Sequence, residues 1–235
     1  MKKWIFTALA AGLLLSACEK ENRQCPGSTD KTFATTGFTK ISAGGTFHVK
    51  ITHGADFQIR ATGCENDLDD LSVVIGAGGI LELDYKNNKK DRYRVDFAIT
   101  MPEIRSVNLS GTAKGMLIGF AGQAGNARAI LSGAAALAVD GSPENIQVDL
   151  SGTGVLTLKG AAGSLRGVLS GAAVLQAFDA PSDEVDLSVS GAGKAYIQAL
   201  KVLTLEAEGA SHIVYRGNPP VKDIVVNGAA KVIRE

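Results

Sequence analysis

One tripeptide, Ser-Gly-Thr or Ser-Gly-Ala, recurs at a nearly constant spacing through the second half of this sequence. Full copies begin at Ser110, Ser132, Ser151, Ser170 and Ser190, and weaker copies follow at Glu208-Gly209-Ala210 and Asn227-Gly228-Ala229. Successive glycines are separated by 22, 19, 19, 20, 18 and 19 residues. A fixed period of this length is typical of solenoid proteins, in which each repeat packs only against its two neighbours.

The residues around each Ser-Gly pair alternate between apolar and polar, as they do in β-strands. Positions five and seven after a repeat serine are apolar in most copies, for example Leu156 and Leu158. Each repeat therefore indicates a strand, a tight glycine corner, a second strand and a loop. The residue directly before each serine is always apolar: Leu109, Leu131, Leu150, Leu169 and Val189.

Such a unit is too small to bury its own apolar face, and stacking solves this problem. Coils about 4.8 Å apart pair their backbone groups with the coils above and below and align like side chains inside. We therefore predict an all-β fold, a right-handed parallel β-helix with about 19–20 residues per coil. A propeller blade needs about twice this period, and leucine-rich, hexapeptide and calcium-binding nonapeptide signatures are missing. An antiparallel β-sandwich remains the alternative.

The predicted domain spans 31–235, with regular coils over 106–235. Residues 31–105 also alternate in short runs, such as Phe47-His48-Val49-Lys50-Ile51 and Leu81-Glu82-Leu83, but without a regular period. A solenoid needs its open end covered, because an exposed sheet edge recruits other chains. We expect 31–105 to form an irregular N-terminal cap and the first coils of the same domain.

The N-terminus has the features of a lipoprotein signal peptide at 1–17. Lys2 and Lys3 precede an apolar run that is too short to span a membrane, and the run ends in Leu15-Ser16-Ala17-Cys18. This tetrad resembles the bacterial lipobox, which implies lipidation of Cys18 and membrane attachment through the lipid. Residues 18–30 are polar and predict a flexible tether. The expected location is the cell envelope, as an outer-membrane lipoprotein that can face the surface.

The two other cysteines, Cys25 and Cys64, leave two readings open. Export places the chain where disulfides persist, so one reading is a Cys25–Cys64 bond that staples the tether to the fold. Two free thiols are the other reading. No CxxC pair occurs, so zinc or thioredoxin-like chemistry has no support.

Composition and motifs favour a protein without catalytic or cofactor chemistry. The 24 basic and 24 acidic residues balance, so nothing indicates a nucleic-acid partner. The repeated serines share one corner position and none lies in GxSxG, which points to a geometric role. His48, His53 and His212 are scattered, so no metal site is expected. We therefore expect no enzyme, no cofactor and no metal.

One outward-facing column has more chemical character than the others. Positions six and eight after the repeat serines carry aromatic, polar and charged side chains in the later coils. Tyr215 takes an inward slot in this register. The column is a candidate strip for a sugar or a protein partner: Lys159, Phe178, Tyr196, Gln198 and Arg216.

The overall layout resembles the head GIN domain family, also called auto-transporter adhesin head domains, of Bacteroidetes. The resemblance covers roughly residues 30–235 and has no catalytic signature. It rests on Phe47 to Gly54, Ile99 to Ile104, the repeated Ser-Gly-Thr/Ala units and the closing Tyr215-Arg216-Gly217-Asn218-Pro219-Pro220. It implies a β-helix-like fold and an envelope location, and it brings no established functional residues.

Three functions are compatible with these features. The favoured one is a lipid-anchored, non-enzymatic module for adhesion or surface display, with a glycan or a surface protein as partner. A carbohydrate-binding or carbohydrate-active protein on a β-helix is the second. The third is a structural envelope component that self-associates as a homo-oligomer.

Overall fold

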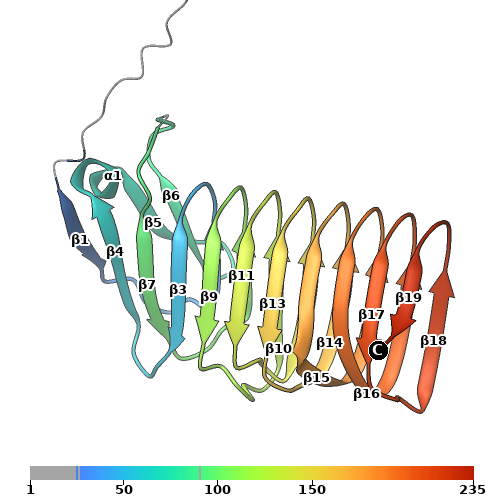
Figure 1. The fold of residues 1–235 in the computed structure, drawn as a ribbon. Coiled ribbons are helices and arrows are strands. Elements are labelled where there is room, and N and C mark those ends of the chain that lie inside the picture. The colour runs from blue at the N-terminus through green and yellow to red at the C-terminus, as the bar shows by residue number, and fades with distance from the viewer. Residues whose placement is uncertain (1–24, 26, 90) are drawn as a thin grey trace, which may run out of the picture.

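The computed structural model describes residues 25, 27–89 and 91–235. Its strands wind around one elongated core as stacked coils, and a row of tight corners runs along one side (Figure 1). Neighbouring coils pair in parallel, so that Asn126 to Leu131 align with Asn145 to Leu150. The predicted all-β parallel β-helix is therefore confirmed, and the sandwich alternative is wrong.

Each coil contributes one strand to a front wall, which faces the viewer in Figure 1, and one strand to a back wall. The front wall consists, in spatial order, of β1 (Ser28–Phe33), β4 (Gln58–Cys64), β7 (Asp96–Met101), β3 (His48–His53), β9 (Lys114–Ile118), β11 (Ala136–Asp140), β13 (Val155–Lys159), the first parts of β15 (Val174–Val189) and β16 (Lys194–Ala207), β17 (His212–Arg216) and β19 (Lys231–Arg234).

The back wall is built in the same way from the strands that lead into the corners. It consists, in spatial order, of β5 (Leu71–Gly76), β6 (Ile80–Tyr85), β2 (Lys40–Ala43), β8 (Ser106–Leu109), β10 (Asn126–Leu131), β12 (Asn145–Leu150), β14 (Ala162–Leu169), the second parts of β15 and β16, and β18 (Val221–Val226). The core lies between the walls, where the leucines that precede the repeat serines are buried.

The corner glycines stack directly on one another, as the repeat predicts. Gly133 and Gly152 have φ of +71° and +72°, a backbone region that favours glycine. The amide of Thr153 donates to the carbonyl of Gly133 at 2.8 Å, and that of Ala172 donates to Gly152 at 2.8 Å. A Cβ built on Gly152 would lie 2.6 Å from the carbonyl oxygen of Gly133. Glycine is therefore required both by the turn and by the coil beneath it.

The first coil of the chain lies out of sequence order. Strands β2 and β3 insert between the β6–β7 coil and the β8–β9 coil, with β3 parallel to both β7 and β9. Its corner joins the glycine column, because the amide of Thr112 donates to the carbonyl of Gly45 at 2.9 Å. Regular stacking thus begins at residue 40, well inside the segment expected to be irregular.

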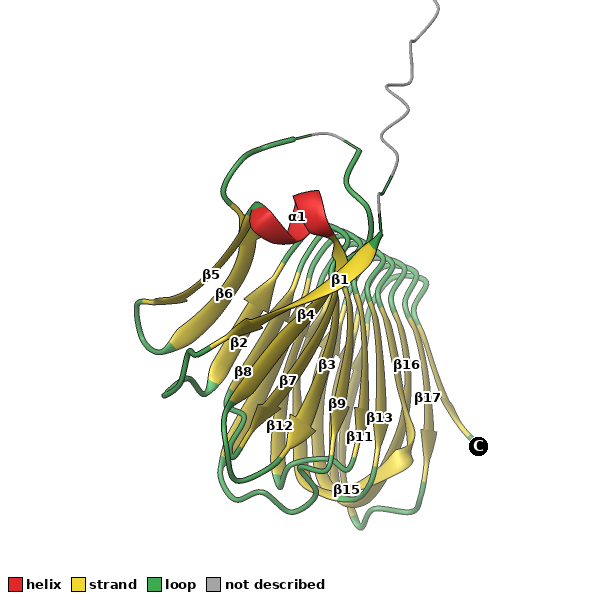
Figure 2. Ribbon diagram, turned by 90° about the vertical axis from the view of Figure 1, so that its left-hand side faces the viewer, coloured by secondary structure: helices red, strands yellow, loops and turns green. Residues whose placement is uncertain are grey.

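The N-terminal end of the solenoid is capped, as Figure 2 shows. Strand β4 pairs antiparallel with β7 and β1, β5 pairs antiparallel with β6, and helix α1 (Glu65–Asp69) lies at this end. Strand β1 begins at Ser28, three residues before the predicted domain boundary at residue 31. Cys25 is joined to Cys64 by a disulfide with Cα atoms 5.6 Å apart. The predicted signal peptide and the predicted lipidation site Cys18 lie outside the described residues.

A buried polar cluster holds the cap against the loop that connects β6 to β7. The guanidinium of Arg92 contacts the carboxylates of Asp67 and Asp70, and all three side chains are buried. It also stacks 3.6 Å from the ring centroid of Tyr85. Burial, reinforced by the negative charge of Asp67, raises the pKa of Tyr85 to about 12.

Candidate binding face

The outer surface of the front wall carries aligned rows of side chains, because the coils stack without a register shift there. One row runs from Lys50 through Met116 and Ala138 to Thr157. The same row continues to Gln176 and Tyr196 on β15 and β16. Residues more than one hundred positions apart in sequence therefore lie on one surface.

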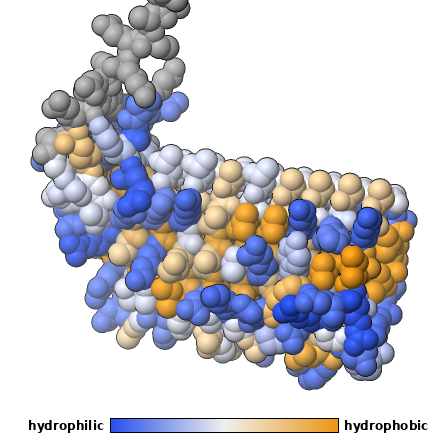
Figure 3. Space-filling model, viewed as in Figure 1, coloured by the Kyte–Doolittle hydropathy of each residue, from blue (hydrophilic) through white to orange (hydrophobic). Residues whose placement is uncertain are grey.

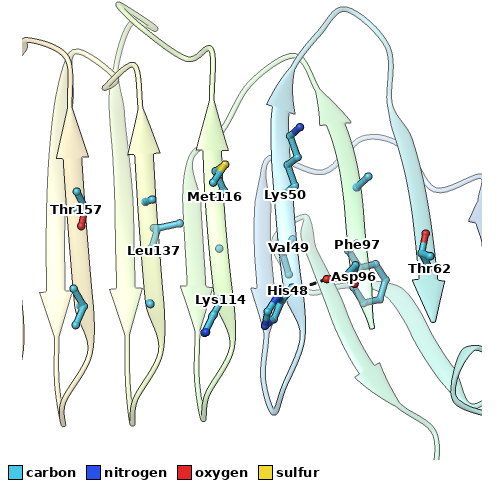
Figure 4. Close-up of a pocket in the computed structure, with 15 residues that line it drawn as sticks. His48, Val49, Lys50, Thr62, Asp96, Phe97, Lys114, Met116, Leu137 and Thr157 are labelled. Carbon is cyan, nitrogen blue, oxygen red and sulfur yellow. Dashed lines mark ion pairs between the residues drawn. The ribbon is translucent and has the colours of Figure 1, made fainter. Parts of the chain in front are cut away.

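A shallow groove of about 590 Å³ crosses the N-terminal half of this wall (Figure 4). Its floor is low because the outward positions there are small, at Ala98, Ala136 and Ala138. The longer side chains of His48, Lys50, Lys114 and Met116 rise from β3 and β9 beside these alanines. Figure 3 shows apolar patches on this face between hydrophilic side chains.

His48 adds little charge to the groove at neutral pH. Its Nδ1 lies 3.6 Å from a carboxylate oxygen of Asp96, which favours the protonated ring. Partial burial, and then the positive charges of Arg94 and Lys114, outweigh that carboxylate and hold the pKa of His48 below its usual value. The permanent charges of the groove therefore come from Lys50 and Lys114 and from the carboxylate of Asp96.

Three of the five residues of the predicted strip lie together in the C-terminal half of the wall. The rings of Phe178 and Tyr196 meet edge to face with centroids 5.6 Å apart, and the guanidinium of Arg216 lies 3.9 Å from the Phe178 ring centroid. These three side chains line a pocket of about 340 Å³. Thr157 lines both this pocket and the groove, so the two form one continuous face.

The remaining strip residues lie on the same wall but outside the pocket lining. Lys159 ends β13 beside Asp140 of β11, and Gln198 pairs in register with Arg216. Tyr215 points inward and is buried, as its register predicts. Sequence reasoning missed the groove itself, because its floor and walls come from β3, β7, β9 and β11, and no local pattern places β3 beside β9.

The repeat serines take part in the corner geometry. The hydroxyl of Ser151 donates to the carbonyl of Leu131 at 3.3 Å, and that of Ser170 donates to Leu150 at 3.4 Å.

On the opposite, back wall, Arg128 pairs with Asp149 at 2.6 Å and Arg166 pairs with Glu184 at 2.7 Å. Across residues 27–89 and 91–235, no three His, Cys, Asp or Glu side chains are grouped as metal ligands.

These features define the class of protein: a capped parallel β-helix whose front wall presents a continuous groove and aromatic pocket. Residues 37–219 match the family model described as "Putative auto-transporter adhesin, head GIN domain", and the chain belongs to this family. The resemblance seen in the sequence is therefore confirmed. No protein in the curated set matches the sequence significantly. No helix in the described part of the chain is long and apolar enough to cross a membrane.

Solved structures share the fold at low sequence identity. A "putative adhesin" from Bacteroides fragilis matches with a TM-score of 0.76 at 17% identity, covering 89% of this chain and 98% of its own. A "putative adhesin" from Parabacteroides distasonis matches with a TM-score of 0.65 at 17% identity, covering 89% and 97%. A "putative lipid binding protein" from the same species matches with a TM-score of 0.66 at 16% identity, with the same coverage.

Proposed function

We propose that this chain is a non-enzymatic envelope protein, anchored by a lipid on Cys18 at the outer membrane, that displays its front wall to bind a partner in adhesion. The observation that carries this proposal is the continuous face formed by the groove and the aromatic pocket. Membership of a family described by an adhesin title supports the proposal at the level of the class.

The aromatic pocket is suited to recognition because its side chains are few, large and held in place. Tyrosine and arginine carry a disproportionate share of binding energy at protein interfaces. Here Tyr196, Phe178 and Arg216 project from paired strands and contact one another, so little conformational freedom remains to be lost on binding. Aromatic faces also pack against sugar rings through their apolar surface.

The double substitution Phe178→Ala/Tyr196→Ala tests this face. The wild-type chain and the variant are compared on arrays of glycans and of envelope proteins, with folding checked by circular dichroism. We expect the affinity for the bound partner to fall at least about tenfold, because truncating interface anchors typically removes more than ~1 kcal/mol each. The matched control is Val168→Ala, an exposed residue of the back wall, which should bind as the wild type does. Equal binding by the double variant would refute this face as the binding site.

The lipid anchor is tested by Cys18→Ala in cells fed with labelled palmitate. We expect the wild-type chain to incorporate label and to fractionate with the membrane, because more than one acyl chain gives durable attachment. The variant should lose both properties. A Cys64→Ser variant serves as the control for loss of a cysteine and should keep the label. Membrane attachment of unlabelled protein would contradict the anchor.

A further inference from the structure

The two walls of the solenoid carry opposite charge, although the chain as a whole is neutral. Coil strands of the front wall, from β7 to β19, hold seven basic and three acidic residues, including Asp179, which lines the aromatic pocket: Lys50, Lys114, Lys159, Lys194, Arg216, Lys231 and Arg234, against Asp96, Asp140 and Asp179. Coil strands of the back wall, from β6 to β18, hold five basic and eight acidic residues: Lys40, Arg128, Arg166, Lys201 and Lys222, against Glu82, Asp84, Asp149, Asp183, Glu184, Asp186, Glu206 and Asp223.

The front-wall lysines are also available for binding. Lys114, Lys159 and Lys194 are exposed, and within the described residues none of them forms an ion pair with a protein carboxylate. By contrast, the back-wall arginines are matched with carboxylates of adjacent coils. Cations left unpaired on a strand-built surface raise the local potential and attract anions.

Three of the front-wall lysines form a row along the solenoid axis. Lys114, Lys194 and Lys231 share one register position at the start of β9, β16 and β19. Lys159 ends β13 in register with Asp140 and Ile118, at the opposite end of the strands. Lys194 and Lys231 are two strands apart, about 9.6 Å, and Lys114 lies four strands from Lys194, about 19 Å. Lys114 lines the groove, and Tyr196 of the aromatic pocket lies two residues from Lys194 on β16, so cations flank apolar surface.

We infer that the front wall binds an extended acidic polysaccharide, laid along the solenoid axis, with carboxylate or sulfate groups on the lysines and a sugar ring on the aromatic pocket. This inference rests on the proposed function and names its ligand class. The spacing of Lys194 and Lys231 matches anions carried on every second sugar of an extended chain. A nucleic-acid strand, with a charge about every 3.4 Å, is more densely charged than this series. A flat anionic membrane would leave the groove unfilled.

The test measures binding of hyaluronan oligomers, which carry a carboxylate on every second sugar, and of neutral dextran oligomers of matched length to the protein. We expect the acidic oligomers alone to bind, and binding to weaken as salt rises, since exposed charges are screened. In Lys114→Glu/Lys194→Glu, affinity should fall at least about tenfold, because two attractions become repulsions. Lys201→Glu/Lys222→Glu makes the same net charge change off the front wall and should stay within about twofold of wild type.

Four results would overturn the inference. The first is that neutral oligomers bind as tightly as acidic ones and that the lysine substitutions do not change the affinity. In that case the proposed function still stands if Phe178→Ala/Tyr196→Ala removes the binding. The second is an equal loss of affinity in Lys201→Glu/Lys222→Glu, which would show that net charge, and not the position of the lysines, determines binding. The third is lysine-dependent binding to phosphatidylglycerol vesicles or to single-stranded DNA but to no acidic glycan. The fourth, binding of no glycan and no envelope protein, would overturn the proposed function as well.

Discussion

Gly152→Ala is expected to lower the free energy of unfolding by more than about 3 kcal/mol, although it adds one methyl group. A non-glycine residue at the φ of +72° costs roughly 1–2 kcal/mol by itself. The larger part comes from stacking, because the new Cβ would lie 2.6 Å from the Gly133 carbonyl oxygen. That oxygen accepts a hydrogen bond from the amide of Thr153. Moving the Gly133 carbonyl away from the new Cβ therefore disturbs a hydrogen bond between coils.

Gly122→Ala separates stacking from backbone strain. Gly122 has a nearly equal φ of +67°, but a Cβ built there meets no atom within 4 Å. We expect this control to lose only the backbone cost of about 1–2 kcal/mol. Urea unfolding followed by circular dichroism compares the two variants. Equal losses of unfolding free energy in the two variants would mean that the corner glycines are required only by the turn conformation. Close contact between stacked coils would then make no contribution.

The second large effect is expected from Arg92→Met in the cap. Removing this guanidinium leaves the buried Asp67 without its cation and leaves the buried Asp70 only Lys89, whose Nζ lies 3.9 Å away. Breaking a buried ion pair from one side typically costs about 3 kcal/mol or more. Arg94→Met is the matched control, because Arg94 is largely exposed and pairs with an exposed Asp96 at 3.0 Å. Surface pairs of that kind contribute about 0–1 kcal/mol.

The loss in Arg92→Met should depend on pH. Hydrogen bonds from Arg92 first, and then from Asn87, hold the pKa of Asp70 below its usual value of 3.8. A depressed carboxyl pKa stabilises the fold above pH 3.8, and that contribution disappears as pH falls through the folded-state pKa. The wild type therefore loses more stability on acidification than the variant, and their difference should narrow below about pH 4. A difference that stays constant from pH 7 to pH 3 would contradict this role of Asp70.

The regular coils could be predicted from the sequence because their stacking leaves a local signature. Each coil repeats the same apolar residue next to the serine and the same glycine at the corner, so the repeat alone aligns Leu131, Leu150 and Leu169. The same register placed Phe178, Tyr196 and Arg216 on one outward surface, and it placed Tyr215 inside.

The position of the first coil could not be predicted from the sequence, because it depends on long-range strand pairing. Ser is replaced by Gly44 at its corner, and 66 residues separate Gly45 from the next glycine of the column, Gly111. No local sequence pattern indicates that β3 lies between β7 and β9. The groove depends on that placement, so its residues could not be grouped from sequence. The Ala43-Gly44-Gly45-Thr46 run between alternating segments was the one available signal.

The stacking of coils in register is tested most directly by distances between spin labels at corner positions. Each of Ala192, Ala210 and Ala229 is changed to Cys together with Thr112→Cys, and electron–electron double resonance measures each pair. These partners lie four, five and six coils from Thr112 in the glycine column. With a strand spacing of about 4.8 Å, the predicted backbone separations are about 19, 24 and 29 Å. Distances that fail to rise in equal steps along this series would contradict the stacked solenoid.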